Sequence, residues 1–581
     1  MRLTLPSRAV VLGALLLMAL LSGSLLLVGG SPVPYRVALP SGRPSPTPPS
    51  GTLIEGTIGS VTTLDPLLAS TPAERDLSAL LFRGLTRLDG DGRIAPDLAD
   101  RWRVQDSGRT YTFVLRSDIR WHDGTPVTAE DVVFTILTLQ HPDYDGGLGA
   151  AWRGVEVQRV GRLSVRFSLP ASTGGFLTAA RVPLIPAHLL SRVPVGERRE
   201  AEGARRPVGN GHFRLASLSA DEAVLVRASS PLEGRSPSAT PGDPLDSPGP
   251  TPLPLEADRQ AGVRRYVFRF YGGQAALAAA FRSGEVDAAG GLAPEQVANL
   301  SGIDGVEAVR YPRTLLTMVA LNLRFEQSIF REPDVRRALL MAVDRKRIIR
   351  EVVESQARPA RTPISPASWA YDEAAARGVP FDPKRAAKLL EAAGWQKRRG
   401  NWWRQGYQQP VEFEVSSVDR KTNPIAYGVA RQVAEDWRVL GLKIIFQAYP
   451  ATDFVEQRLG RRRHQAALVE VNVGLDPDLY PLLASTQAGV GGTNISGYQD
   501  RELDRLLGAA RRYAVPATRE ARFDELQVML GRELPVLPLF FSDYVYLIWD
   551  NLDGPTPRQL ATPSDRFWDV LTWRLADDTH E

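Results

Sequence analysis

Two polar side chains on one strand-like segment are the clearest candidates for contacting a bound molecule. Residues 466–473 alternate as a β-strand does, which places Glu470 and Asn472 on one face. Valines occupy the opposite face at Val469, Val471 and Val473. We expect the valines to pack in a core, which leaves a carboxylate and an amide free to bind a polar group.

Three further candidates lie on loops. Asp476 precedes a proline, where an acid more often forms a turn than a contact. Trp369 and Tyr371 follow two prolines, and their rings can stack on a ligand. We interpret Trp402 and Trp403, in a hairpin-like segment beside arginines, as local packing.

The chain lacks the common signatures of catalysis. Its six histidines show no H-x-x-x-H spacing, and the G-x-x-x-x-G-K phosphate loop is absent. It has no G-x-S-x-G elbow and no cysteine. We therefore expect no enzyme, metal site or cofactor, although catalytic groups can also assemble from distant residues.

Length and charge exclude other classes. With 581 residues the chain can build more than one core. Basic residues number 70 against 66 acids, a net charge of +4, and they are scattered along the chain. Nucleic-acid-binding proteins gather basic residues on one face, so we expect no nucleic acid as a partner.

The N-terminus predicts export. Two arginines precede an uncharged apolar run from Ala9 to Gly30, long enough to span a bilayer as a helix. We expect residues 1–30 to be a membrane anchor, with a cleaved signal peptide as the alternative. In both cases the remainder lies on the extracytoplasmic face of a bacterial membrane. The Pro-rich residues 31–51 predict an extended linker.

The rest of the chain mixes strand and helix patterns. Strand patterns fit residues 109–116, 266–270, 319–323, 411–415, 443–447 and 466–473. Helix patterns fit residues 128–137, 333–350, 382–393, 425–440, 500–512 and 519–530. This mixture indicates α/β lobes with mixed sheets. A Pro-rich stretch at residues 229–259 predicts a long surface loop.

Several motifs resemble those of the family 5 extracellular solute-binding proteins. The densest are LFRGLTRL at 81–88, IAPDLADRW at 94–102, YTFVLR at 111–116 and WHDGTPVTAEDVV at 121–133. Later matches are PVGNGHFRL at 207–215, FRSGEVD at 281–287, DVRRAL at 334–339 and AAKLL through GW at 386–395. They occur in the family's order, and the resemblance covers nearly all of residues 52–560.

The resemblance implies a bilobal fold that closes on a small solute and delivers it to the permease of an ABC importer. It implies a first lobe of residues 52–72, 206–313 and 534–581, a subdomain at 73–205, and a second lobe at 314–533. Two chain crossings form the hinge, near residues 311–317 and 534–539. The second lobe lines the cleft in this family, so Glu470, Asn472, Asp476, Trp369 and Tyr371 are the expected ligand residues. We expect a monomer whose solute is peptide-like, with an oligosaccharide or a metal chelate as alternatives.

One position departs from the family pattern. In peptide-binding members, an aspartate four residues before a proline pairs with the ligand's α-amino group, and Val473 stands there in this chain. A buried ammonium without a partner is costly, so ordinary peptide binding is not expected. Either Glu470 supplies the carboxylate, or the ligand is neutral or differently charged, or Glu470 serves only the structure.

Two other functions stay open. A membrane-tethered solute sensor or interaction protein can keep this fold without transport, and neighbouring permease and ATPase genes would distinguish the two. An exported hydrolase is the third alternative.

Overall fold

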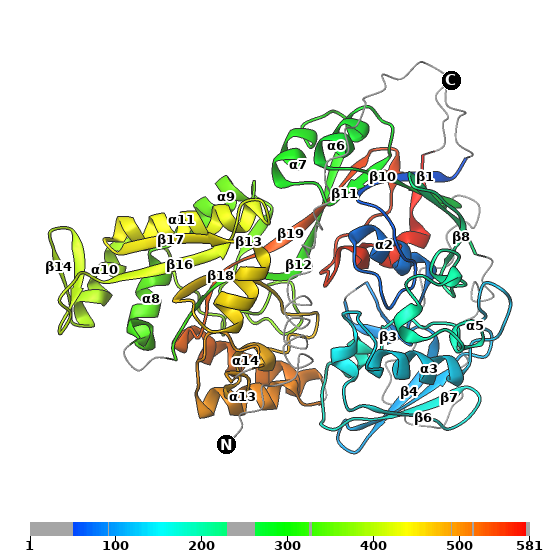
Figure 1. The fold of residues 1–581 in the computed structure, drawn as a ribbon, viewed down its shortest axis with the longest axis horizontal. Coiled ribbons are helices and arrows are strands. Elements are labelled where there is room, and N and C mark those ends of the chain that lie inside the picture. The colour runs from blue at the N-terminus through cyan, green and yellow to red at the C-terminus, as the bar shows by residue number, and fades with distance from the viewer. Residues whose placement is uncertain are drawn as a thin grey trace.

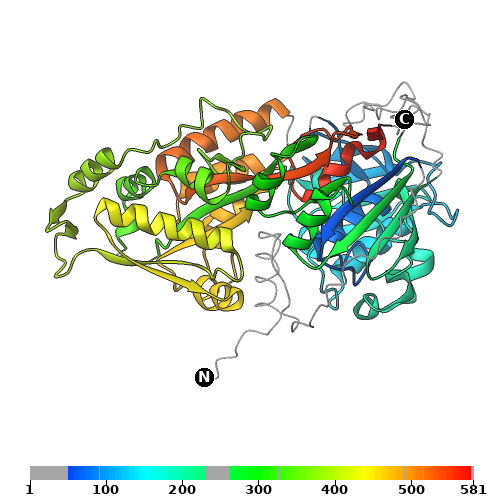
Figure 2. The same cartoon turned by 90° about the horizontal axis from the view of Figure 1, so that it is seen from above.

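Two lobes joined by a continuous sheet make up the computed structural model, which describes residues 50–90, 92–228, 262–324, 328–489, 491–513 and 516–576. The sheet has the order β17-β16-β18-β12-β19-β11-β1-β10-β9-β8. The strands on this path are β1 (Thr52–Ile58), β8 (Phe213–Leu218), β9 (Glu222–Arg227), β10 (Arg265–Tyr271), β11 (Ala288–Gly290), β12 (Val306–Leu321), β16 (Glu412–Val418), β17 (Lys443–Tyr449), β18 (Ala466–Asn472) and β19 (Leu537–Trp549), and β13 (Ala357–Pro359) pairs with β19 off the path. β12 and β19 lie side by side and run from one lobe to the other (Figures 1 and 2).

Separate hydrophobic cores define the two lobes. We call lobe I the part that packs around cores within residues 53–311 and 544–573, and lobe II the part that packs around cores within residues 316–541. Because β12 and β19 are long enough to reach both cores, the lobes share these strands. The chain therefore crosses between the lobes on paired strands.

Lobe I brings distant parts of the chain together. β1 pairs in parallel with β10, and β11 pairs antiparallel with β19. The helix α2 (Pro72–Leu81) packs against the C-terminal helical segment η7 (Pro563–Thr572). α6 (Gln274–Arg282) and α7 (Pro294–Leu300) surround a smaller core on the other face of the sheet.

A subdomain of lobe I has its own antiparallel sheet. The order is β4-β5-β7-β6, built from β4 (Ala99–Gln105), β5 (Thr110–Leu115), β6 (Glu156–Arg159) and β7 (Ser164–Ser168). The helix α3 (Ala129–Gln140) packs on this sheet. Asp131 accepts a hydrogen bond from the backbone N–H of Thr128 at 2.8 Å, as in a capping box at the start of a helix.

Lobe II is a sheet with helices on both faces. One core lies under α8 (Pro333–Met341), α9 (Arg345–Val352), α10 (Pro383–Ala392) and α11 (Pro424–Leu440). The other lies under α12 (Tyr480–Leu483), α13 (Arg501–Arg511) and α14 (Pro516–Glu533). The prediction that Val469, Val471 and Val473 are core residues is confirmed, because all three pack in the second core.

One predicted helix is wrong in extent. Residues 333–350 were expected to form one helix, but α8 ends at Met341 and α9 begins at Arg345. The side chain of Asp344 accepts a hydrogen bond from the backbone N–H of Arg347 at 2.9 Å, and this cap starts a new helix. The other helices and strands agree with their predicted positions to within a few residues, apart from β12, which extends far beyond its predicted strand.

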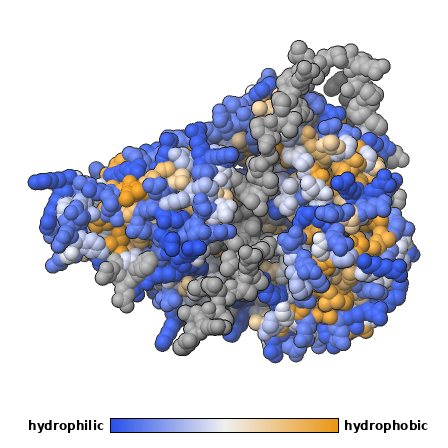
Figure 3. All heavy atoms as spheres, viewed as in Figure 1, coloured by the Kyte–Doolittle hydropathy of each residue, from blue (hydrophilic) through white to orange (hydrophobic). Residues whose placement is uncertain are grey.

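The predicted anchor, most of the linker, and the 229–259 loop lie outside the described residues. Among the residues that are described, no helix is both long and apolar enough to cross a bilayer. On the face seen in Figure 3, apolar residues form patches on both lobes, with hydrophilic residues around them.

His464 makes the stability of lobe II depend on pH. Its side chain is fully buried, and burial lowers its pKa to about 4. An unfolded histidine titrates near 6.5, so the unfolded chain binds a proton at a pH where the folded chain does not. The free energy of unfolding therefore falls as the pH drops below about 6.5. Between pH 7 and pH 5 we expect this side chain to remove about 2 kcal/mol of stability.

Urea unfolding of the wild type and His464→Leu at these two pH values tests this. The leucine variant should lose about 2 kcal/mol less than the wild type on acidification, whatever its stability at neutral pH. An identical pH dependence in the two proteins would contradict the expectation.

Candidate functional site

A polar strip crosses the sheet between the two lobes. On one face of β12 and β19, Tyr311 and Tyr544 pack in the lobe I core, whereas Val319 and Phe540 pack in a lobe II core. Alternate residues of a strand point to the same side, so the residues between these pairs share that face. The polar residues on this face are Arg313 and Thr317 of β12 and Ser542 of β19. The neighbouring strand β18 adds Glu470 and Asn472 to the same face. We call these five residues the hinge face.

Glu470 is held in the hinge face by the start of a helix. It lies directly opposite Thr317 in the pairing of β12 with β18. Its Oε2 accepts a hydrogen bond from Nδ2 of Asn423, the residue that caps α11, at 3.0 Å. Burial raises the pKa of Glu470, and nearby Arg313 opposes this rise. A half-buried carboxylate in this position can accept a cationic group that enters between the lobes.

Asn472 connects the lobes and has little capacity left for a ligand. Its Oδ1 accepts hydrogen bonds from the Thr314 hydroxyl at 2.5 Å and from the backbone of Gly474 at 3.0 Å. Its Nδ2 donates to the carbonyl oxygen of Ala561, in the C-terminal part of lobe I, at 2.8 Å. These contacts position β18 against lobe I.

Asp476 and Trp369 meet around an arginine that the sequence analysis did not single out. Both oxygens of Asp476 accept hydrogen bonds from Arg519 on α14, at 2.7 and 2.8 Å. The guanidinium lies over the Trp369 ring, 4.9 Å from its centroid, and the same ring packs edge-on against Phe523. Tyr371 is half-buried beside this core, and burial raises its pKa. No contact among the described residues joins Tyr371 to Glu470 or Asn472.

The Asp476–Arg519 pair lies where lobe II touches the subdomain of lobe I. The backbone N–H of Gly174 donates to the carbonyl oxygen of Arg511 at 2.8 Å. Ser172 Oγ accepts from the backbone N–H of Tyr513 at 3.2 Å. Both contacts join segments that are far apart in the chain, so the lobes are in contact at this point as well as at the hinge.

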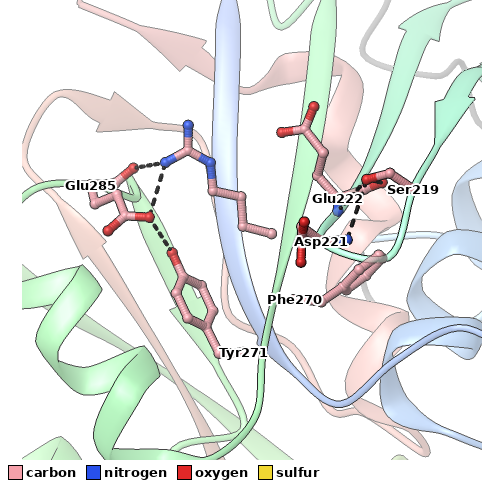
Figure 4. Close-up of a pocket in the computed structure, with 7 residues that line it drawn as sticks. Ser219, Asp221, Glu222, Phe270, Tyr271 and Glu285 are labelled. Carbon is pink, nitrogen blue, oxygen red and sulfur yellow. Dashed lines mark hydrogen bonds and ion pairs between the residues drawn. The ribbon is translucent and has the colours of Figure 1, made fainter. Parts of the chain in front are cut away.

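A surface pocket of about 430 Å³ opens on lobe I (Figure 4). Its lining residues are Ser219, Asp221, Glu222, Arg269, Phe270, Tyr271 and Glu285. Glu285 already accepts hydrogen bonds from Arg269 and Tyr271, as the dashed lines show. Since every lining residue belongs to lobe I, a molecule bound here would not draw the lobes together. We therefore place the candidate site at the hinge face.

Comparison with known proteins identifies the family. Residues 93–492 match the model of the bacterial extracellular solute-binding proteins, family 5. The chain belongs to this family. The oligopeptide-binding protein AppA of Bacillus subtilis is 24% identical to it over 535 residues, which cover 90% of this chain and 92% of AppA.

Solved structures of similar fold include two ligand complexes. NikZ from Campylobacter jejuni with Ni(L-His) has a TM-score of 0.67 at 22% identity, covering 90% of this chain and all of that chain. AppA from B. subtilis with a nonapeptide has a TM-score of 0.66 at 22% identity, covering 91% of this chain and 99% of that chain. These neighbours confirm the expected bilobal α/β fold.

Family 5 proteins bind solutes outside the cytoplasm, in agreement with the extracytoplasmic location expected from the sequence. Among the described residues, no group of three or more His, Asp or Glu side chains is placed to hold a metal ion.

Three residues near the candidates were missed by the sequence analysis. Arg313 carried a usable signal, because it is a charged residue within the predicted hinge crossing. Asn423 and Arg519 carried none, since they lie 47 and 43 positions from their partners Glu470 and Asp476. Only the folded chain brings them together.

Proposed function

We propose that this chain is the substrate-binding protein of an ABC importer and captures a peptide-like solute by closure of its two lobes. The hinge face carries this proposal, because a solute bound there reaches β18 of lobe II and the strands shared with lobe I. A ligand that contacts both lobes favours the closed state by its difference in affinity for closed and open forms. The permease would then receive the closed, loaded protein. We assign it no catalytic reaction.

Glu470 is the proposed anchor for a cationic group of the solute. The matched family position, Val473, is packed in a lobe II core and offers no acceptor. Glu470 faces the opposite side of the same strand, with a carboxylate oriented by Asn423. The geometry therefore favours a replacement carboxylate over a neutral ligand.

Residues 1–30 are proposed to tether the protein to the membrane, with residues 31–51 as the spacer. The uncharged run of the N-terminal segment supports this role.

Calorimetric titration with peptides tests the anchor. A thermal-shift screen of di- to pentapeptides, oligosaccharides and metal chelates first identifies binders, since bound ligand stabilises the fold. Matched peptides with free and acetylated N-termini are then titrated against the wild type and Glu470→Gln. We expect the free peptides to bind, and the Gln variant to bind them roughly 100-fold or more weakly, because it leaves a buried ammonium unpaired.

Asp453→Asn, on a surface segment of lobe II, is a charge-matched control that should leave affinity unchanged. Equal binding of free and acetylated peptides, or exclusive binding of oligosaccharides or chelates, would contradict the assignment of Glu470.

A further inference from the structure

Arg313 occupies an irregular part of a strand that both lobes share. The pairing of β12 with β19 shifts register between Pro312 and Leu316. On its other side β12 pairs with β18, where Leu315 lies opposite Asn472 and Thr317 lies opposite Glu470. Arg313 thus lies two residues before Leu315 on β12, at the lobe I end of the hinge face.

The guanidinium of Arg313 has no protein partner within the described residues. Its Nε is buried and makes no hydrogen bond, and the side chain forms no ion pair there. Arg336 and Arg519, two buried arginines, show the usual arrangement. Arg336 donates hydrogen bonds to three backbone carbonyls, and Arg519 donates hydrogen bonds to both carboxylate oxygens of Asp476. Desolvating a cation without such partners costs free energy, which an incoming anion can recover.

A neighbouring polar group also keeps capacity for a ligand. The hydroxyl of Ser542, on the same sheet face, is buried and makes no hydrogen bond among the described residues. Thr317 is 1% exposed and lies directly opposite Glu470, whose carboxylate its hydroxyl supports. Burial lowers the pKa of Arg313 and raises that of Glu470, and each charge opposes the shift of the other. The two groups are therefore near one another without forming a direct ion pair.

We propose that Arg313 binds a carboxylate of the solute and, together with Glu470, selects ligands that carry both an anionic and a cationic group. The inference rests on the proposed function and adds a second determinant of specificity. A zwitterion satisfies both charges of the hinge face. A ligand with only one charge leaves the other desolvated and unpaired, so its affinity is lower.

Retention of a random tripeptide library tests this pair of contacts. The library is made with four end chemistries, which combine a free or acetylated N-terminus with a free or amidated C-terminus. Peptides retained by the purified protein are quantified by mass spectrometry. The wild type should retain the doubly free class, and should favour a free carboxylate over an amide by about tenfold or more.

Variants separate the two contacts. Arg313→Gln should reduce the carboxylate-to-amide preference to about one while keeping the preference for a free N-terminus, and Glu470→Gln should do the reverse. Arg313→Lys should restore part of the carboxylate preference, because it keeps the charge. Arg358→Gln, a half-exposed arginine on the neighbouring strand β13 (Ala357–Pro359), is the matched control and should behave as the wild type.

Each contrary result has a distinct meaning. An unchanged carboxylate preference in Arg313→Gln, or equal retention of acids and amides by the wild type, would overturn the role of Arg313 and leave the proposed function intact. Failure of the wild type to retain any of the four classes would overturn the peptide-like solute and this inference together. Urea unfolding of each variant checks that it is folded.

Discussion

Replacing Arg566 with leucine is expected to destabilise lobe I by about 3–5 kcal/mol, the largest stability effect we predict. Arg566 is fully buried on η7 and donates to Glu55 of β1 at 2.5 Å and to both oxygens of Asp76 of α2 at 2.7 and 3.0 Å. Tyr546 also donates to Glu55, at 2.8 Å. The substitution leaves two buried carboxylates without their cation.

Hydrogen exchange locates this effect. Since Arg566 joins the first strand and helix to the C-terminal segment, amides of β1 and α2 should exchange roughly two to four decades faster in the variant. Amides of α13 in lobe II should change much less. Arg505→Leu is the control, because Arg505 is exposed and pairs with acids at the surface, where solvent screening makes the loss of an ion pair cost little. Unchanged exchange in β1 and α2 would contradict the role of Arg566.

Gly174→Leu is expected to weaken solute binding by about 5- to 150-fold without unfolding the protein. A Cβ at Gly174 would lie 2.4 Å from Cζ of Arg519. That guanidinium cannot easily move, because Asp476 binds it through both oxygens and Trp369 stacks on it. The leucine therefore opposes contact between the subdomain and lobe II, and the solute must supply the extra free energy of closure.

Titration of a wild-type ligand into Gly174→Leu and Gly175→Ala measures this. Gly175 is the neighbouring control, because its nearest contact for a Cβ is an ordinary 3.7 Å from Asp476. Small-angle scattering should show a larger radius of gyration for Gly174→Leu than for the control. Wild-type affinity in Gly174→Leu would show that this contact is not part of closure.

Local patterns were sufficient for most elements of the fold. Alternation identified β18 and the core side of the valines, and the helix patterns located the starts of α3 and α10 to within a residue. These features depend on neighbouring residues, which the sequence displays directly. The local pattern was wrong at residues 333–350. In the sequence Asp344 fits the polar side of one amphipathic helix, but in the structure its side chain caps a new helix.

Local sequence patterns predicted only part of the candidate site. Strand alternation identified Glu470 and Asn472 as the polar side of β18, and a loop pattern identified Asp476 and Trp369. Their partners come from other segments: Asn423 and Arg313 beside Glu470, Thr314 and Ala561 on Asn472, and Arg519 between Asp476 and Trp369.

The sequence by itself determined the secondary structure, the family and the polar face of β18, because these follow from side-chain periodicity and motif order. The tertiary structure decided which candidates keep free capacity for a ligand. Asn472 and Asp476 use their polar atoms in contacts within the protein, and Glu470 uses part of its capacity on Asn423, whereas Arg313 makes no hydrogen bond among the described residues. Hydrogen-bond saturation depends on groups that are distant in sequence, so no local pattern could reveal it.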